Sequence, residues 1–313
     1  MKYILKKIAI FLLTLFGISV LVFFAFQIIP GDPTTRMLGT QATPEKVAAL
    51  REQLGLNDPA VLRYFKWLFN FLKGDFGSSY SYNMPVSQLL SGKIAITAAL
   101  SGMAFAMVLC MSIPIGILRA RFAHSIPDRI SMVLNQIIMS VPPFFIGIIF
   151  TYVFGLMMKL FTPGDFIPHA QDPSAFWGYL VFPALAIAMP KSAMVVKLLR
   201  SSMVREMSED YVRTAYSRGN SRWQVLRRHV MRNAIIPVVT FLAVTLVDII
   251  AGSIIIEQVF AIPGMGRLLL SSIIGRDLPV VQTIIMIISF AVITVNYLAD
   301  ISYKYIDPRI RFR

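Results

Sequence analysis

Long apolar runs separated by shorter polar segments dominate the pattern of this 313-residue chain. A helix rises 1.5 Å per residue, so crossing a hydrocarbon core of about 30 Å takes about 20 apolar residues. Six runs reach this length, at residues 8–29, 94–118, 130–154, 177–199, 235–256 and 280–299. The pattern predicts an all-α, polytopic membrane protein in which 1–313 form one domain with six transmembrane helices.

Charged residues are scarce, which makes their positions informative. Only 15% of the chain is charged and 56% is hydrophobic, whereas soluble domains carry about 25% charged residues. The first run has no charge and follows Lys2, Lys6 and Lys7. Because it is longer than the core of about 7–15 residues in a secretory signal, we interpret it as an uncleaved anchor.

Basic residues gather on one side of the predicted membrane. With the N-terminus inside, the inside segments hold 19 basic and 6 acidic residues, and the outside segments hold 10 basic and 9 acidic ones. An excess of Lys and Arg marks the cytoplasmic side. Both termini are therefore predicted to be cytoplasmic. The net charge of +14 has a topological origin, and nucleic-acid binding is not expected.

The first outside loop, residues 30–93, is long enough to carry structure of its own. Thr43, Pro44 and Glu45 form a typical helix start, and Gly55 is a typical stop. This short amphipathic helix has two compatible interpretations: a cap over the bundle, or a docking surface for an extracytoplasmic delivery protein.

The segment between the fourth and fifth runs, residues 200–234, predicts a pair of short helices. Ser208 is placed to cap a first helix whose first turn contains Glu209 and Asp210, and acidic residues there favour the helix dipole. Gly219 then breaks the helix, because glycine adopts positive φ without steric cost.

A second helix is predicted to start at Ser221, with Gln224 completing a capping box. Trp223, Leu226 and Val230 form its apolar stripe. The resulting helix-glycine-helix elbow has two interpretations. It could lie on anionic lipid, which its arginines would favour, or it could receive the push of a motor protein. Spacing does not decide between them.

Several motifs in this chain resemble those of bacterial ABC importer permeases, and of the oligopeptide/dipeptide import family in particular. The elbow reads DYVRTAYSRG at 210–219 and continues as HVMRNAIIP at 229–237. Further motifs follow the same order as in that family: IIPGDP at 28–33, LGLNDP at 54–59, GDFGSSY at 74–80 and IIEQVFAIPGMGRLLLSSIIGRDLP at 255–279. One departure is Arg213-Thr214-Ala215, where the general importer signature begins Glu-Ala-Ala; peptide-type permeases share this departure.

The resemblance implies the type I importer permease fold in a bacterial inner membrane, and the first of two permease subunits. It implies that residues 208–225 form a coupling helix seated on a separate ATPase. The residues implied for this contact are Tyr211, Arg213, Thr214, Ala215, Arg218, Gly219, Asn220, Ser221 and Arg222. The implied partners are a second permease chain in a heterodimer, two ATPase subunits that bind ATP and magnesium, and an extracytoplasmic binding protein.

The sequence contains no recognisable catalytic motif or cluster of catalytic residues. It contains no GxxxxGK[ST] phosphate loop, the backbone cradle that ATP requires. His124, His169 and His229 fall in loops on both sides of the predicted membrane, and Cys110 is the only cysteine. We therefore expect no catalytic residue, no metal site and no cofactor in this chain.

Two charges interrupt the apolar runs, Lys191 in the fourth and Asp248 in the fifth. Ionisable groups at membrane depth are costly, so each marks a candidate function. They could pair with each other, line a translocation path, or relay protons. Asn135 and Gln136 in the third run could likewise line the path, or hydrogen-bond neighbouring helices.

Three functional classes remain in view. The first is the ATP-driven permease, with peptides as cargo or with glutathione or nickel complexes. The second is an ion-coupled secondary transporter using Asp248, which would need no ATPase. The third is a membrane-embedded enzyme, for which a cluster of catalytic residues at one membrane face should appear.

Overall fold

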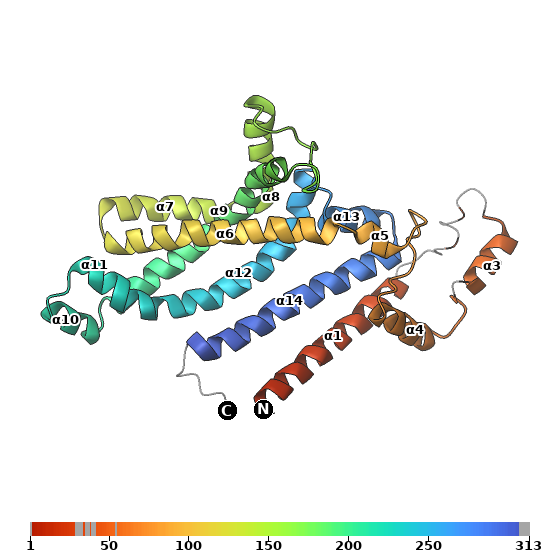
Figure 1. Ribbon diagram of the computed structural model, residues 1–313, viewed down its shortest axis with the longest axis horizontal. Coiled ribbons are helices and arrows are strands. Elements are labelled where there is room, and N and C mark those ends of the chain that lie inside the picture. Colours follow the sequence, from red (N-terminus) through yellow and green to blue (C-terminus); the bar gives the residue numbers. More distant parts are fainter. Residues whose placement is uncertain (1, 29–33, 35–37, 39–41, 54, 307–313) are drawn as a thin grey trace. The chain divides into compact units, whose positions relative to one another are not determined.

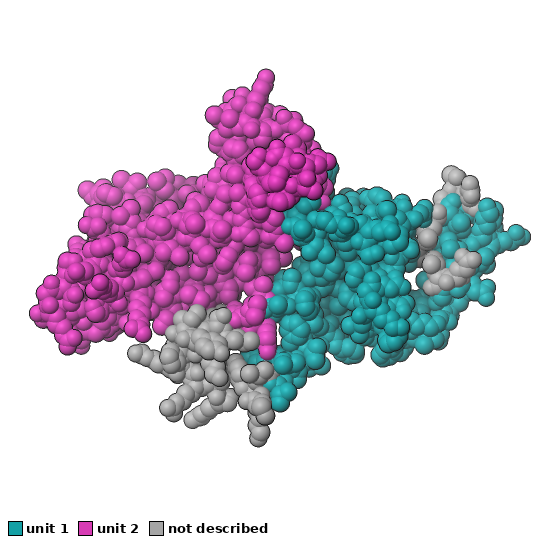
Figure 2. Space-filling view, in the orientation of Figure 1, with its two compact units in different colours: residues 1–96, 264–294 teal, residues 97–263, 295–313 magenta. Residues whose placement is uncertain are grey.

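The computed structural model describes residues 2–28, 34, 38, 42–53 and 55–306. Throughout this part of the chain the regular structure is helical, and the labels in Figure 1 follow chain order. The chain divides into two compact units, residues 1–96 with 264–294 and residues 97–263 with 295–313 (Figure 2). Each unit is described by itself.

The first unit is built on the N-terminal helix. Its helices are α1 (Lys2–Ile28), α3 (Pro44–Gln53), α4 (Ala60–Leu72), α5 (Val86–Leu90), α13 (Met265–Ile274) and most of α14 (Leu278–Ile306). Buried Asp277 fixes the loop that precedes α5: it accepts hydrogen bonds from the Ser79 hydroxyl, from Tyr80 N at 3.1 Å and from Ser81 N at 3.0 Å. The α13–α14 turn thereby organises a segment almost 200 residues earlier in the chain.

The second unit is built around its longest helix, α9 (Pro173–Glu206), which packs against α7, α8 and α12. Its other elements are most of α6 (Lys93–Arg121), α7 (Ile126–Ser140), α8 (Pro143–Phe150), the π-helix η2 (Thr151–Met157), α10 (Asp210–Ser217), α11 (Arg222–Gln224), the π-helix η3 (Val225–Val230) and α12 (Met231–Val259). In the most apolar stretch of α9, 67% of the residues are buried, against 17% in α1. The core of this unit therefore lies along α9.

Within the described residues, five helical stretches are long and apolar enough to cross a bilayer. They are Leu5–Phe26, Val86–Arg121, Pro173–Glu206, Arg222–Val259 and Leu278–Ala299. A sixth crossing is possible if Ile126–Ser140 and Pro143–Met157, which are bent by 94° at their junction, count as one broken span. The predicted all-α, polytopic membrane fold is confirmed.

The predicted span at 130–154 is divided into two helices that are bent by 94° at their junction. Val141 and Pro142 adopt extended backbone, with ψ of 124° and 142°, and α8 starts afresh at Pro143. A proline lacks an amide donor and disfavours the α conformation in the residue before it. Two consecutive prolines therefore end α7 and redirect the chain. The hydrophobicity of the run conceals this break.

The helix predicted in the first outside loop starts and stops where expected. α3 begins at Pro44 directly after Thr43, and Gly55 follows it with φ of +64°. Residues 29–33 of the IIPGDP motif and Leu54 lie outside the described residues, as do 307–313. The sequence also predicts that this loop contains short helices in general; two further ones, α4 and α5, lie in it at positions that were not predicted.

Candidate functional site

The segment between α9 and α12 forms the predicted elbow, and Figure 1 shows it where these two helices end and begin. α10 is the first arm, and α11 with η3 is the second. The second arm runs without a loop into α12, because η3 ends at Val230 and α12 starts at Met231. The second arm is therefore continuous with the candidate span Arg222–Val259, whereas residues 207–209 form a short turn between α9 and the first arm.

Gly219 lies at the break between the arms with φ of +81°. A Cβ added there would meet nothing within 4 Å, so backbone conformation and not space demands the glycine. Ser221 then starts α11 with the full predicted capping box: its hydroxyl accepts from Gln224 N at 3.4 Å, and the Gln224 side chain accepts from Ser221 N at 2.9 Å. The break and restart predicted from the sequence are confirmed.

The predicted role of Ser208 is wrong. Glu209 occupies the N-cap position of α10, and the Ser208 hydroxyl donates to the Arg205 carbonyl at 2.6 Å. The reason is that α9 continues to Glu206, so Ser208 lies in the turn that closes α9. A serine hydroxyl readily bonds a carbonyl three residues earlier instead of capping the next helix.

The elbow has a buried face and an exposed face. Val212, Ala215, Leu226 and Val230 are buried. Of the residues implied for ATPase contact, six are exposed, namely Arg213, Thr214, Arg218, Gly219, Ser221 and Arg222, while Tyr211 and Asn220 are half-buried. Ala215 is 5% exposed, so its side chain packs inside the elbow and offers no surface to a partner.

Trp223 departs from the predicted apolar stripe. Leu226 and Val230 are buried, but Trp223 is 45% exposed and lies under the Arg121 guanidinium, 5.6 Å from the ring centroid. Arg222 Nη2 donates to the Arg121 carbonyl at 2.9 Å. The end of α6 thus holds the second arm through a cation–π contact and a hydrogen bond.

Tyr211 holds the first arm. Its hydroxyl donates to Glu206 Oε2 at 2.7 Å, which ties α10 to the last turn of α9. Burial, followed by this hydrogen bond to a carboxylate, raises the pKa of Tyr211. Asn220 Nδ2 donates to the Ala215 carbonyl at 3.0 Å and closes the turn behind α10. Both arms are therefore fixed at their roots.

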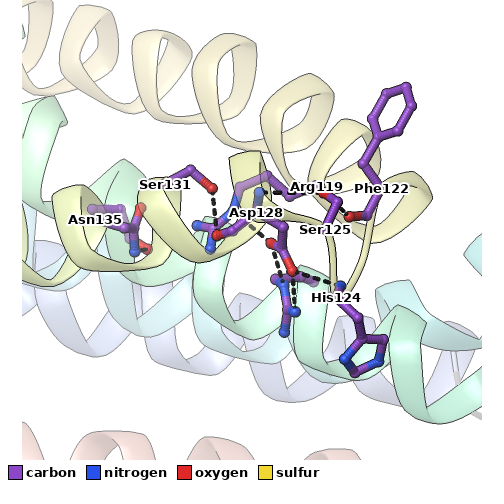
Figure 3. A network of polar contacts seen from close by, with 9 residues as sticks. Arg119, Phe122, His124, Ser125, Asp128, Ser131 and Asn135 are labelled. Carbon is purple, nitrogen blue, oxygen red and sulfur yellow. Dashed lines mark hydrogen bonds and ion pairs between the residues drawn. The ribbon is translucent and has the colours of Figure 1, made fainter.

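A buried charge cluster lies at the start of α7 (Figure 3). Asp128 is 2% exposed, and both of its oxygens accept from Arg200 of α9, one of them from Nε at 2.8 Å. Arg119 Nε, near the end of α6, lies 3.5 Å from the same carboxylate, and His124 N donates to it at 3.1 Å. Asp128 thereby joins three helices at the end of the unit that carries the elbow.

Reading the sequence did not find this cluster. Ser125 caps α7 and Asp128 lies at its third position, where an acidic residue suits the helix dipole without any further partner. Nothing local indicates pairing with Arg200. The available signal was that Asp128 is the single acidic residue among three arginines in 119–129.

The predicted path residues lie together on the second unit. Lys191 of α9 and Asp248 of α12 form an ion pair at 2.6 Å, with side chains 18% and 51% exposed. Asn135 Nδ2 donates to the Ala193 carbonyl at 2.8 Å, and Lys197 Nζ donates to Gln136 Oε1 at 3.4 Å. Lys191 also lines a hollow of about 230 Å³ at the α7–α8 break, together with Met139, Pro142, Pro190 and Met194.

The three histidines do not gather at one place: His229 lies within η3 of the elbow, and His124 contributes only its backbone amide to the Asp128 cluster. His169 makes edge contacts with the rings of Phe176 and Trp177. Across the described residues, no group of three or more His, Cys, Asp or Glu side chains could hold a metal ion.

Two family models together cover nearly the whole chain. The binding-protein-dependent transport system inner membrane component matches residues 112–312, and the N-terminal part of the same membrane component matches residues 1–101. Among solved structures, the MetNI methionine ABC transporter matches with a TM-score of 0.56 at 17% identity, covering 70% of this chain and 97% of that one. This likeness concerns the fold.

Curated relatives are similar over their full lengths. A putative peptide transport system permease protein of Brucella abortus is 35% identical over 99% of this chain and 98% of its own. A probable peptide ABC transporter permease of Sinorhizobium fredii is 33% identical over 99% of both chains. The glutathione transport system permease GsiC of Salmonella paratyphi A is 33% identical over 100% of both. The chain therefore belongs to the binding-protein-dependent transport system inner membrane component family, as a multi-pass, non-catalytic permease component of an ABC importer.

Proposed function

We propose that this permease forms half of the pathway of a peptide importer and that its elbow, residues 208–225, couples the pathway to separate ATPase subunits. The observation that carries the proposal is the elbow itself: exposed polar groups project from a bend whose second arm continues into α12 and whose first arm is tied to the last turn of α9 by the Tyr211–Glu206 hydrogen bond. A rigid bend rooted in two spans converts a partner's movement into helix movement. A contact made only with lipid would not require this stiffness.

In this mechanism two ATPase subunits bind ATP and magnesium and close, the elbow moves with them, and the spans alternate between inward and outward access. A second permease chain supplies the other half of the pathway in a heterodimer, and an extracytoplasmic binding protein delivers the cargo. Both termini of the chain are cytoplasmic, in keeping with the distribution of Lys and Arg.

Peptides are the proposed cargo because the Brucella and Sinorhizobium relatives are named for peptide transport. Glutathione, for which the Salmonella relative is named, is the alternative within the same family. Lys191 and Asp248 could meet the terminal charges of either cargo if their ion pair opens during transport. An ion-coupled transporter built on Asp248 loses its support, because the family is that of ABC importer components.

The test uses the reconstituted importer with matched arginine variants. Arg213→Ala removes an exposed charge of the proposed contact, whereas Arg129→Ala removes an exposed charge at the start of α7, outside the elbow. We expect Arg213→Ala to lower the rate of uptake of labelled di- and oligopeptides by about tenfold, equivalent to about 1.4 kcal/mol of activation free energy. Arg129→Ala should remain near the parental rate. Equal rates for both variants would contradict the proposed contact.

A further inference from the structure

α4 (Ala60–Leu72), in the first outside loop, has three distinct faces. Tyr64, Trp67 and Phe71 recur at helical spacing and turn inward, with Tyr64 only 3% exposed. A second row is apolar yet exposed: Val61 at 60%, Phe65 at 55%, Phe69 at 59% and Leu72 at 76%. The third face is polar and carries Arg63, Lys66, Asn70 and, just after the helix, Lys73.

The inward face packs on α1, beside which α4 lies in Figure 1. The Tyr64 hydroxyl shares a 2.8 Å hydrogen bond with the Ser19 hydroxyl. The Phe23 ring contacts both Tyr64 and Trp67, with centroids 5.5 Å apart in each case. These contacts fix the position of α4 along the axis of α1, which is itself a candidate span.

The residues of α1 that contact α4 lie before the C-terminal end of its apolar stretch. The candidate span of α1 ends at Phe26, three residues after Phe23 and seven after Ser19. At 1.5 Å per residue, the contacts lie about 5–10 Å inside this end. Interfacial amphipathic helices bury their apolar face to the same depth of about 5–10 Å at the boundary between headgroups and acyl chains.

The exposed apolar row lies next to the exposed apolar surface of α1. α1 exposes large apolar side chains along its length, including Leu13 at 70%, Phe16 at 47% and Leu21 at 70%. In a candidate span that is only 17% buried, these side chains are suited to contact acyl chains. The α4 row Val61–Phe65–Phe69–Leu72 lies beside the face by which α4 contacts α1.

The polar face matches phospholipid headgroups in charge. Lys73 Nζ lies over the Phe69 ring at 4.1 Å, so its charge sits at the boundary between the polar and apolar faces. Lys66 pairs with Asp58 at 2.7 Å and is 60% exposed. Long basic side chains at such a boundary keep their stems in apolar surroundings and their charges at the phosphates.

We propose that α4 is an interfacial helix of the phospholipid bilayer, with Val61, Phe65, Phe69 and Leu72 in the acyl chains and its basic face at the headgroups. The leaflet is the one reached by the C-terminal end of α1. In this arrangement α4 holds α1 laterally and at fixed depth. The occupant of the exposed apolar row is lipid, rather than the second permease chain or the delivery protein.

The test measures depth in the complete importer, reconstituted in phosphatidylethanolamine–phosphatidylglycerol bilayers. Spin labels are placed singly at Phe65→Cys, Phe69→Cys, Lys66→Cys and Asn70→Cys in a Cys110→Ser background. Collisions with oxygen report the acyl region, and collisions with a water-soluble nickel chelate report water. We expect severalfold higher oxygen-to-nickel ratios at positions 65 and 69 than at 66 and 70. Leu13→Cys on α1 provides the reference for lipid contact.

Two results would overturn the proposal. Ratios at 65 and 69 that equal those at 66 and 70 would place the apolar row in water. Exclusion of both reagents at 65 and 69, but not at 13, would show that another protein chain covers the row. Phe69→Trp, with the three native tryptophans replaced by phenylalanine, checks the result without a label. Its fluorescence should be quenched by brominated acyl chains, and an unquenched signal would also overturn the proposal.

Discussion

Arg200 of α9 donates to both carboxylate oxygens of Asp128 at the start of α7. Arg200 lies ten residues before Asp210, where the first arm of the elbow begins. Both side chains are largely removed from solvent, at 14% and 0% exposed. The contact fixes the last turns of α9 against α7. Because α9 leads into the elbow, this pair sets the direction from which the first arm projects.

Asp128→Asn should destabilise the permease by about 3 kcal/mol, because removing one partner of a buried ion pair leaves the others as uncompensated charges. Here both Arg200 and Arg119 would lose their counter-charge. The measurement is the thermal unfolding of the purified complex. Asp165→Asn, at an exposed loop position, is the control and should unfold like the parent. If the two variants unfold at the same temperature, the ion pairs of Asp128 do not contribute to the stability of the permease.

Lys191→Met and Asp248→Asn should each impair folding or transport more than the double change does. Each single change leaves one charge of the 2.6 Å pair uncompensated, and the double change leaves none. A double-mutant cycle on stability should give a coupling energy of about 0.5–3 kcal/mol. Strictly additive effects would mean that the two side chains act independently.

Gly219→Val should uncouple ATP hydrolysis from uptake while leaving membrane insertion intact. A β-branched residue at φ of +81° costs about 1–3 kcal/mol of backbone strain, which the exposed bend can relieve by changing the angle between the arms. Hydrolysis and uptake are measured together in proteoliposomes. Gly102→Ala in α6, where an added Cβ meets nothing and φ is ordinary, should preserve the parental ratio. A parental ratio of uptake to hydrolysis in Gly219→Val would contradict the proposed role of the bend at Gly219.

Tyr211→Phe should lower stability by about 1 kcal/mol near neutral pH, the contribution of one hydrogen bond. The raised pKa of Tyr211 favours the protonated phenol in the folded protein. This contribution is complete below the unfolded pKa of about 10 and is lost as pH rises through the folded value. Unfolding midpoints of the parent and Tyr211→Phe should therefore converge above pH 10. A gap that stays constant with pH would contradict this assignment.

The fold was predictable because its signals are local. Apolar length identified the long helices, and Gly219 with Ser221 and Gln224 identified the bend and restart of the elbow. The break at Val141–Pro142 also has a sequence signal, the two consecutive prolines. The prediction followed the length of the apolar run instead and assigned one span to it. Ser208 was misassigned because the end of α9 could not be located from propensity alone.

The anchoring of the site was not predictable, because it depends on contacts between distant residues. Asp128 and Arg200 are 72 residues apart, and each has an ordinary local explanation. Lys191 and Asp248 attracted notice only because charge is rare in apolar runs; their pairing was one of several readings until the helices were placed. In a membrane protein, unusual residues are visible in the sequence, but their partners emerge only from packing.

Site-specific crosslinking of the elbow tests the central claim most directly. Thr214→Cys in a Cys110→Ser background is placed on the exposed face of α10, and Arg129→Cys at the start of α7 serves as the off-elbow control. We predict that Thr214→Cys crosslinks to a co-purified ATPase subunit, with a yield that changes between ATP-bound and nucleotide-free states, whereas Arg129→Cys does not. Crosslinking of Thr214→Cys to phospholipid alone, with no ATPase adduct in either state, would contradict the account.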